Sequence, residues 1–179
     1  MRASVEIEPI NQNQQQQIVD CTLGWIDRAG QLMAKPFTPV TVAFDLKGRS
    51  AGMYKVRNGS RVIRYNPYLF AKYYQDNLSN TVPHEVAHYV TDCLYGIRNI
   101  QPHGAEWVGV MNAFGVEANV TGIYDLDGVP VRRFKQFEYH CGCKIHQLTS
   151  RRHNKLIRGA VRYFCRECGN ELLLASVSS

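Results

Sequence analysis

The chain has 179 residues, enough for one ordinary domain and a small additional module, and its hydrophobic content of 45% is sufficient to build a core. It contains no apolar run long enough to cross a bilayer, and its first residues lack the apolar centre of a signal peptide. The composition therefore argues against a membrane protein, and we expect a soluble cytoplasmic protein without a membrane partner.

The net charge of +6 is concentrated near one end of the chain. Residues 1–130 carry 11 Lys and Arg against 12 Asp and Glu, whereas residues 131–179 carry 10 against 3. We therefore expect two domains, a nearly neutral one over 1–130 and a basic one over 131–179. A compact basic module is typical of proteins that bind a polyanion, most commonly nucleic acid, although the same charges also keep a small module soluble.

The first predicted element is an amphipathic helix. A polar run over residues 11–17, which we expect to be frayed, leads into it. Apolar residues then recur at helical spacing between Gln15 and Met33, and the helix is expected to end near Gly30.

A small sheet is predicted next. Its three strands are expected at 40–44, 51–57 and 60–65. The dipeptide Asn58-Gly59 predicts a tight hairpin between the last two strands, because both turn positions favour a positive φ. We expect the sheet to be antiparallel. A short helix from Pro67 to about Gln75 follows it.

The sequence His84-Glu85-Val-Ala-His88 is the main candidate for chemistry. On a helix, two histidines four residues apart project from the same face, which is the spacing at which two imidazoles bind one metal ion. Glu85 lies beside them, where a carboxylate can take a proton from water at the open coordination position. The surrounding residues are apolar at helical spacing, which favours a metal site over a chance match.

The boundaries of this helix are indicated by turn-forming residues. We expect it to begin within residues 76–80 and to end at Gly96. Pro83 is tolerated if it falls in the first turn and bends the helix if it falls later. A further helix is predicted over residues 105–114, where the apolar positions are again spaced for a core.

A catalytic zinc ion usually has three protein ligands, so a third is needed. His103 is the first candidate, since it follows His88 by 15 residues and opens the next predicted helix. The alternatives are that His103 is a surface cap and that the third ligand is a carboxylate, either Glu106 or Asp92.

After a turn-rich connection over 115–135, the basic domain carries a second predicted metal site. Four cysteines fall within 28 residues, at Cys141, Cys143, Cys165 and Cys168. Two such pairs about 20 residues apart are typical of a structural zinc ion in a reducing compartment. Because the spacing of the first pair is unusually tight, His146 and His140 are alternative ligands there.

The stretch between the two cysteine pairs is densely cationic. Its charged residues include Arg151, Arg152, Lys155 and Arg158. Cations interleaved with polar residues suit contacts to the phosphates of a nucleic acid. The alternative is an ordinary solvated hairpin of the zinc module.

Taken together, these segments resemble the bacterial SprT family. The matching segments are Val-Pro-His-Glu-Val-Ala-His at 82–88, Pro-His-Gly-Ala-Glu-Trp at 102–107, Tyr-His-Cys-Gly-Cys at 139–143, Arg-Arg-His-Asn at 151–154 and Tyr-Phe-Cys-Arg-Glu-Cys-Gly at 163–169. The resemblance covers about residues 15–174 and extends, more distantly, to the protease domain of Spartan, which degrades proteins crosslinked to DNA.

The resemblance implies an α+β, zincin-like metalloprotease domain followed by a C-terminal zinc ribbon. It implies that His84, His88 and His103 bind a catalytic zinc ion, that Glu85 is the general base, and that a second zinc ion is structural. It also implies that a protein substrate binds in an extended form beside a strand edge, for which 60–65 is the candidate. The Cys-x-Cys pair departs from the Cys-x-x-Cys of many relatives, which leaves the ligand set of the ribbon open.

Together with these motifs, the resemblance implies a monomeric zinc metalloprotease that acts on DNA-associated or DNA-crosslinked proteins, with single-stranded or duplex DNA as a partner. The alternative is a DNA-binding or regulatory zinc protein without hydrolytic activity. Glu85 favours the enzyme, because a purely structural metal site has no need of a carboxylate at that position.

Overall fold

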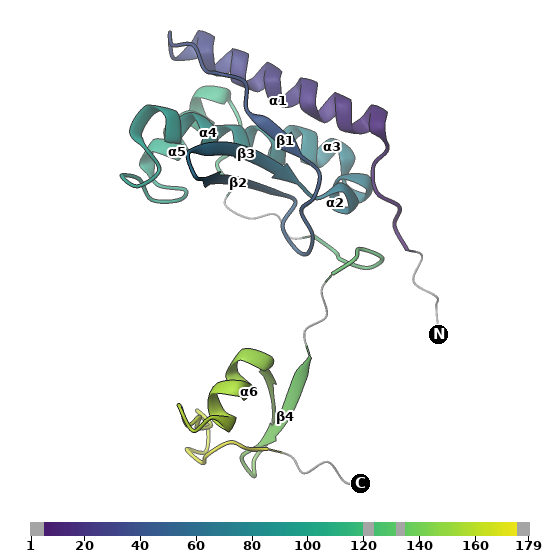
Figure 1. The fold of residues 1–179 in the computed structure, drawn as a ribbon, viewed down its shortest axis with the longest axis vertical. Coiled ribbons are helices and arrows are strands. Elements are labelled where there is room, and N and C mark those ends of the chain that lie inside the picture. The colour runs from purple at the N-terminus through teal and green to yellow at the C-terminus, as the bar shows by residue number, and fades with distance from the viewer. Residues whose placement is uncertain (1–5, 120–123, 132–134, 175–179) are drawn as a thin grey trace. The chain divides into compact units, whose positions relative to one another are not determined.

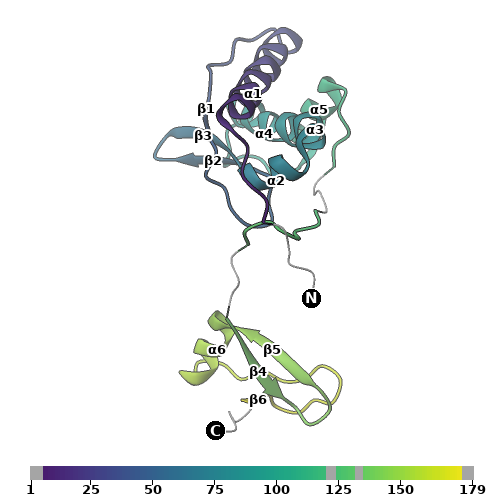
Figure 2. The same cartoon turned by 90° about the vertical axis from the view of Figure 1, so that its right-hand side faces the viewer.

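The computed structural model describes residues 6–119, 124–131 and 135–174. The chain forms two compact units, residues 1–131 and 132–179, whose secondary structure is shown in Figures 1 and 2. Helices and small sheets occur together, so the α+β class is confirmed. Within the described ranges, no helix is long and apolar enough to span a membrane.

Helix α1 (Gln12–Leu32) begins inside the polar run that we expected to be frayed. The side chain of Asn11 accepts a hydrogen bond from the Gln14 backbone at 2.9 Å, and the Gln14 side chain accepts one from the Asn11 backbone at 3.0 Å. This reciprocal capping satisfies two backbone donors that would otherwise lack partners. The expectation of a frayed start was therefore wrong.

The sheet of the first unit has three strands. They are β1 (Thr41–Ala43), β2 (Gly52–Arg57) and β3 (Ser60–Tyr65), in the order β1-β3-β2. The predicted hairpin joins β2 and β3, with φ of 50° at Asn58 and 78° at Gly59. However, β1 runs parallel to β3, so the expectation of a wholly antiparallel sheet was wrong. The direction of so short a strand depends on the path of its connection, which a strand pattern does not encode.

The position of β3 also overturns the predicted substrate strand. All of residues 60–65 pair with β2, and residues 62–64 also pair with β1 on the other side, so β3 is the central strand and not an edge strand. The two edge strands are β1 and β2, and β2 is the one that lines the cavity with the histidines. In a hairpin with a two-residue turn, the two flanking residues, here Arg57 and Ser60, form a hydrogen-bonded pair. Every second residue of β2 counted back from Arg57 therefore bonds to β3, and the residues between them direct their N–H and C=O groups away from β3. Those residues are Gly52, Tyr54 and Val56.

The predicted central helix is preceded by a wider helical turn. The elements after the sheet are α2 (Pro67–Lys72), α3 (Tyr74–Asp76), the π-helical turn η1 (Asn77–Thr81) and α4 (Val82–Tyr95). Pro83 is the second residue of α4, so one backbone hydrogen bond is missing where η1 joins α4. The N–H of Val82 bonds to the carbonyl of Asn77, five residues back, so η1 enters α4 without a break. The α-helical geometry of α4 begins only at Val82, but η1, which continues into it, begins at Asn77, within the predicted range. The predicted end at Gly96 (φ 80°) is confirmed.

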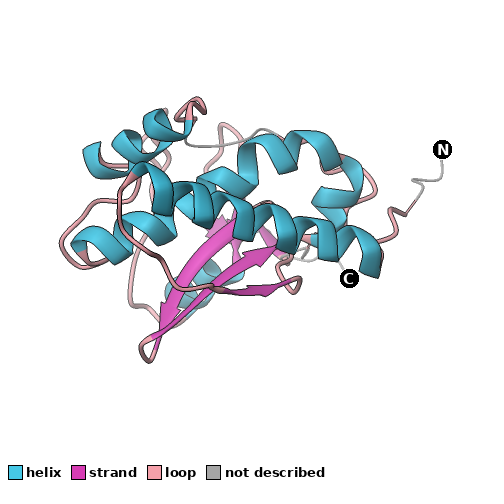
Figure 3. Cartoon of the chain, turned by 90° about the horizontal axis from the view of Figure 1, so that it is seen from above, coloured by secondary structure: helices cyan, strands magenta, loops and turns pink. Residues whose placement is uncertain are grey.

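Helix α5 (Ala105–Phe114) has the predicted bounds. The helices lie against one face of the sheet (Figure 3), where Ile63 and Tyr65 are fully buried. The hydroxyl group of Tyr65 lies 3.0 Å from that of Thr22 on α1, which ties the first helix to the central strand. Residues 124–131 run along this unit, since Val129 packs with Ala51.

The second unit has a three-stranded sheet and one helix. Its elements are β4 (Gln136–His140), β5 (Ile145–Thr149), α6 (Ser150–Ile157) and β6 (Leu173–Leu174), with strand order β5-β4-β6. Neither interpretation of the cationic stretch included a helix. The ring of His153 on α6 stacks on Phe137, with centroids 3.6 Å apart, and its Nδ1 lies 2.8 Å from the Tyr139 hydroxyl. This contact between distant residues holds a polar segment in helical form.

Candidate functional site

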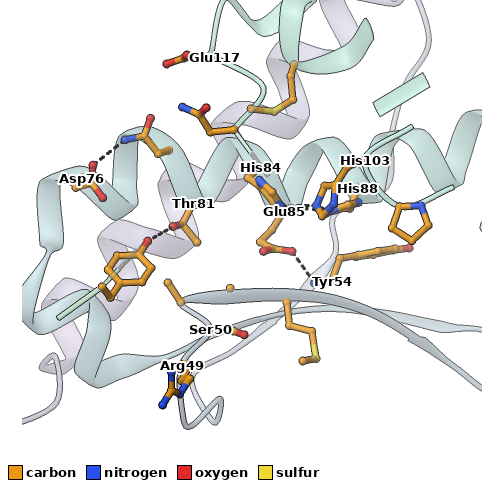
Figure 4. A pocket seen from close by; sticks show the side chains of 18 of the residues that line it. Arg49, Ser50, Tyr54, Asp76, Thr81, His84, Glu85, His88, His103 and Glu117 are labelled. Carbon is orange, nitrogen blue, oxygen red and sulfur yellow. Dashed lines mark hydrogen bonds between the residues drawn. The ribbon is translucent and has the colours of Figure 1, made fainter. Parts of the chain in front are cut away.

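Three histidines of the first unit converge on one point. The Nε2 atoms of His84 and His88 are 3.2 Å apart, and that of His103 lies 3.1 Å from each of them. The corners of a tetrahedron with zinc–nitrogen bonds of about 2.05 Å are about 3.3 Å apart, close to these spacings. The three nitrogens therefore fit one face of a tetrahedral zinc site, with the fourth position open. Figure 4 shows the three rings together beside Glu85.

Protonation of these rings is disfavoured, which suits metal binding. Burial, followed by repulsion from His103, lowers the pKa of His84 to about 4. Burial, followed by repulsion from the other two rings, lowers the pKa of His88 to about 3. Burial also lowers the pKa of His103. A metal ligand must be a neutral imidazole, so the cluster is in the required form at neutral pH.

Each histidine is positioned by a different local feature. His84 and His88 are one turn apart on α4, as the spacing predicted. His103 has a φ of 58°, a left-handed conformation that a non-glycine residue rarely adopts, and it lies two residues before the start of α5. This backbone turn points its ring back at α4. Strain of this kind at a candidate site is consistent with a functional constraint.

Trp107 is a site residue that sequence reasoning assigned only to the core. Its ring lies 4.7–5.5 Å from all three histidine rings, centroid to centroid. Its indole N–H donates to the carbonyl of His84 at 3.3 Å. Its position four residues after His103 is no helical spacing, because His103 precedes α5 and has a left-handed φ, so the sequence held no local signal for this role.

Glu85 lies against the start of β2 and is only 6% exposed. Its Oε2 accepts a hydrogen bond of 2.7 Å from the backbone N–H of Tyr54. Burial raises the pKa of Glu85 to about 8, and the Tyr54 N–H opposes this shift. The carboxyl group is thus able to gain and lose a proton near neutral pH in the absence of a metal ion.

The alternative third ligand Asp92 is engaged elsewhere. Its Oδ2 accepts hydrogen bonds from the Tyr54 hydroxyl at 2.6 Å and from Arg61 Nε at 2.7 Å. Its Oδ1 accepts one from the Ile97 backbone at 2.7 Å. Glu106 is not part of the group either, since among the described residues the donor atoms that gather here belong to the three histidines.

The histidines and Glu85 line a cavity of about 1020 Å³. Its walls include the start of β2, Ile97 and Pro102 from the loop after α4, and Tyr73 and Tyr124. Tyr124 is held there by bonds of its hydroxyl group to η1, at 2.7 Å to Asn77 Oδ1. This volume is at the upper end of the range for ligand sites, which leaves room for a peptide segment next to the free edge of β2.

The second unit gathers its four cysteines as predicted from their spacing. Their Sγ atoms lie within 4.8 Å of one another, with 3.2 Å between Cys141 and Cys143 and 3.7 Å between Cys143 and Cys165. Sulfurs bound to one tetrahedral zinc ion are about 3.8 Å apart. His146 is also near, with its Nε2 3.2 Å from Cys141 Sγ, whereas His140 is exposed on the neighbouring strand. The cluster therefore offers four thiols and one adjacent imidazole.

The cationic residues lie on or next to helix α6. Arg151, Arg152 and Lys155 are within α6, and Arg158 caps its end. All four are exposed, and none forms an ion pair with the residues that the structure describes. In contrast, Lys144 and Arg162 of the same unit pair with Glu167 and Glu171.

Comparison with known proteins gives a consistent assignment for both units. The SprT-like family matches residues 24–133, and the SprT-like zinc ribbon domain matches residues 135–174. The chain is 38% identical to Protein SprT of Vibrio parahaemolyticus over 90% of this chain and 92% of that protein. It is 34% identical to Protein SprT of Photorhabdus laumondii, over 92% and 82%, and 35% identical to that of Shewanella oneidensis, over 90% and 99%. No solved structure matches the chain.

Proposed function

The chain belongs to the SprT-like family and ends in a zinc ribbon, and from this membership we propose that it is a zinc-dependent metallopeptidase. The observation that carries the proposal is the convergence of the Nε2 atoms of His84, His88 and His103 at the wall of a large cavity, with Glu85 beside them. Three neutral imidazoles and an adjacent buried carboxylate are the side chains that a hydrolytic zinc site requires.

His84, His88 and His103 would hold the zinc ion. Bound there, zinc supplies a Lewis acid for the scissile carbonyl group and a water molecule of lowered pKa. Glu85 takes the proton of the attacking water and passes it to the leaving amine. The buried position of Glu85 suits this role, because a carboxyl group whose pKa is raised holds a proton long enough to return it.

The substrate chain is proposed to extend along the free edge of β2. Edge strands bind extended peptides through main-chain hydrogen bonds. The outward backbone groups of Gly52 and Val56 and the carbonyl group of Tyr54 are available for this pairing, while the Tyr54 N–H is bonded to Glu85. A protein segment bound there would pass directly over the histidine cluster.

The ribbon is proposed to hold a second, structural zinc ion through Cys141, Cys143, Cys165 and Cys168. Four protein thiolates close a tetrahedral site and leave no position for substrate. The exposed cations on α6 have no acidic partners among the described residues, which supports a role in binding the phosphates of DNA. The substrates would then be cytoplasmic proteins bound or crosslinked to DNA, cleaved by a monomeric enzyme.

The observation that disfavours a purely regulatory zinc protein is the incomplete ligand set of the histidine cluster. Among the described residues, it offers three donors at the wall of a cavity, where a structural site would have four. A direct test is proteolysis of a DNA-binding protein, measured with and without DNA at low and moderate salt. We expect DNA to increase cleavage, and salt to reduce the increase. Cleavage that ignores both would leave the peptidase proposal in place and refute the role of DNA.

A further inference from the structure

The start of β2 lies unusually close to the side chain of Glu85. A Cβ atom placed on Gly52 would lie 2.6 Å from both Cγ and Oε1 of Glu85, and 2.8 Å from Cγ2 of Thr81. Distances below about 3 Å are shorter than carbon atoms tolerate in a packed interior. The φ of Gly52 lies outside the left-handed region, so the backbone conformation itself does not require glycine here. The absence of a side chain is needed for space.

The neighbouring groups have little freedom to move away. Glu85 is buried, and its Oε2 is fixed by the 2.7 Å hydrogen bond from the Tyr54 backbone. Thr81 is also buried, and its hydroxyl group donates to Asn77 at 2.6 Å. The residue after Glu85 in α4, Val86, is fully buried in the core, so the helix is not free to shift. A methyl group on residue 52 would therefore displace the carboxylate first.

We infer that Gly52 is a positioning residue for Glu85, which leaves the space in which the carboxylate lies against β2 and accepts the Tyr54 N–H. This inference rests on the proposed peptidase function. The two contacts act together. The glycine permits close approach, and the N–H two residues later fixes the orientation of the carboxylate that the approach brings near.

The same edge of β2 has two roles. It is proposed to receive the substrate backbone, and its Tyr54 N–H also holds the proton-transfer group in position. Substrate and base are thereby held by one rigid element. Because β2 positions both, the distance between the substrate and the Glu85 carboxylate is fixed, and the rate of proton transfer depends on this distance.

The test is Gly52→Ala in the zinc-loaded, full-length protein, with kcat, KM and zinc content measured. We expect kcat to fall about a hundredfold, the scale for an ångström of misplacement, while KM and zinc content change little. The matched control is Gly109→Ala on α5, where an added Cβ meets nothing within 4 Å. It should leave all three quantities unchanged. A Gly52→Ala enzyme with wild-type kcat would overturn the inference.

A stability measurement makes the steric contact testable apart from activity. Gly52→Ala should lower the melting temperature of the wild-type protein, and lower it less when Glu85→Ala has already removed the crowded side chain. If Gly52→Ala alone does not fold, folding of the Gly52→Ala/Glu85→Ala pair supports the contact, and failure of both overturns it. Additive effects of the two substitutions would also overturn it. This readout remains valid if Glu85→Gln proves active and the proposed function fails.

Discussion

The hydroxyl group of Tyr54 donates a hydrogen bond of 2.6 Å to the carboxylate of Asp92. The two residues are 38 positions apart, on β2 and α4. Since the backbone N–H of Tyr54 also bonds to Glu85, one residue of the strand is tied to the helix at two points, two turns apart. The strand edge and the histidine helix are therefore held as a unit.

Asp92→Ala should destabilise the first unit. Asp92 is 5% exposed and accepts bonds from Tyr54, Arg61 and the Ile97 backbone, all of which would lose their partner. Because Arg61 is partly exposed and can regain water, we expect a loss of about 2 kcal/mol in the free energy of unfolding. Denaturant titration measures this loss.

The matched control for that substitution is Asp45→Ala. Asp45 also pairs with an arginine of β3, Arg64, but its side chain is 63% exposed. We expect a change below about 0.5 kcal/mol, as for most surface ion pairs. Equal losses for Asp92→Ala and Asp45→Ala would show that the bonds of Asp92 between strand and helix contribute no more to stability than an exposed ion pair.

Glu85→Gln should stabilise the metal-free protein in a pH-dependent manner. The pKa of Glu85 rises from 4.5 to about 8 on folding, mainly through burial. Between these values the unfolded chain releases the proton while the native protein keeps it, so the wild type loses stability as the pH rises. A glutamine side chain does not ionise, so the variant does not lose stability in this way. At pH 8 the variant should be more stable by about 4 kcal/mol, and at pH 4 the two proteins should be nearly equal, as measured by denaturant unfolding after chelation. A difference independent of pH would contradict this account.

Metal counting should separate the two zinc sites. We expect two zinc ions per chain in the wild type and one in His103→Ala, because the remaining pair of histidines makes a weak site. A mild chelator should remove the histidine-bound ion first, since its fourth position is open. One zinc ion in the wild type, or two in His103→Ala, would contradict the ligand assignment.

Substitution of His146 tests which donors complete the ribbon. His146→Ala should retain the ribbon zinc, because four thiols are sufficient for a closed site. The exposed His140→Ala serves as the control and should have no effect. If His146→Ala loses the ribbon zinc while Cys143→Ala retains it, the imidazole replaces that thiol as a ligand.

Removing positive charges from α6 should weaken binding to DNA of any base sequence. We expect Arg151→Ala and Lys155→Ala each to reduce the slope of log affinity against log salt by about one. Arg162→Ala is the control within the same unit, because that guanidinium pairs with Glu171. An unchanged slope for the α6 variants, measured by fluorescence anisotropy with single-stranded and duplex DNA, would exclude this helix as the contact surface.

Local signals made part of the fold predictable. The Asn58-Gly59 hairpin and the bounds of α5 follow from turn chemistry and from apolar spacing over a few residues. The approach of His84 and His88 followed in the same way from one helical turn. These features depend on neighbours in the sequence.

The features that were missed depend on residues far apart in the chain. The parallel direction of β1 is set by its connection, and α6 is stabilised by stacking of His153 on Phe137, 16 positions away. The bond between Tyr54 and Asp92 and the free edge of β2 are likewise consequences of tertiary packing. No pattern within one segment encodes such contacts.

The measurement that tests the central claim most directly is cleavage of a DNA-bound protein by Glu85→Gln. Glu117→Gln provides the control, because Glu117 lines the same cavity and is exposed. We expect Glu85→Gln to bind two zinc ions, to retain its fold and to lose cleavage by at least about a hundredfold, while Glu117→Gln cleaves like the wild type. Undiminished cleavage by a zinc-loaded Glu85→Gln protein would contradict the assignment of Glu85 and, with it, the proposed mechanism.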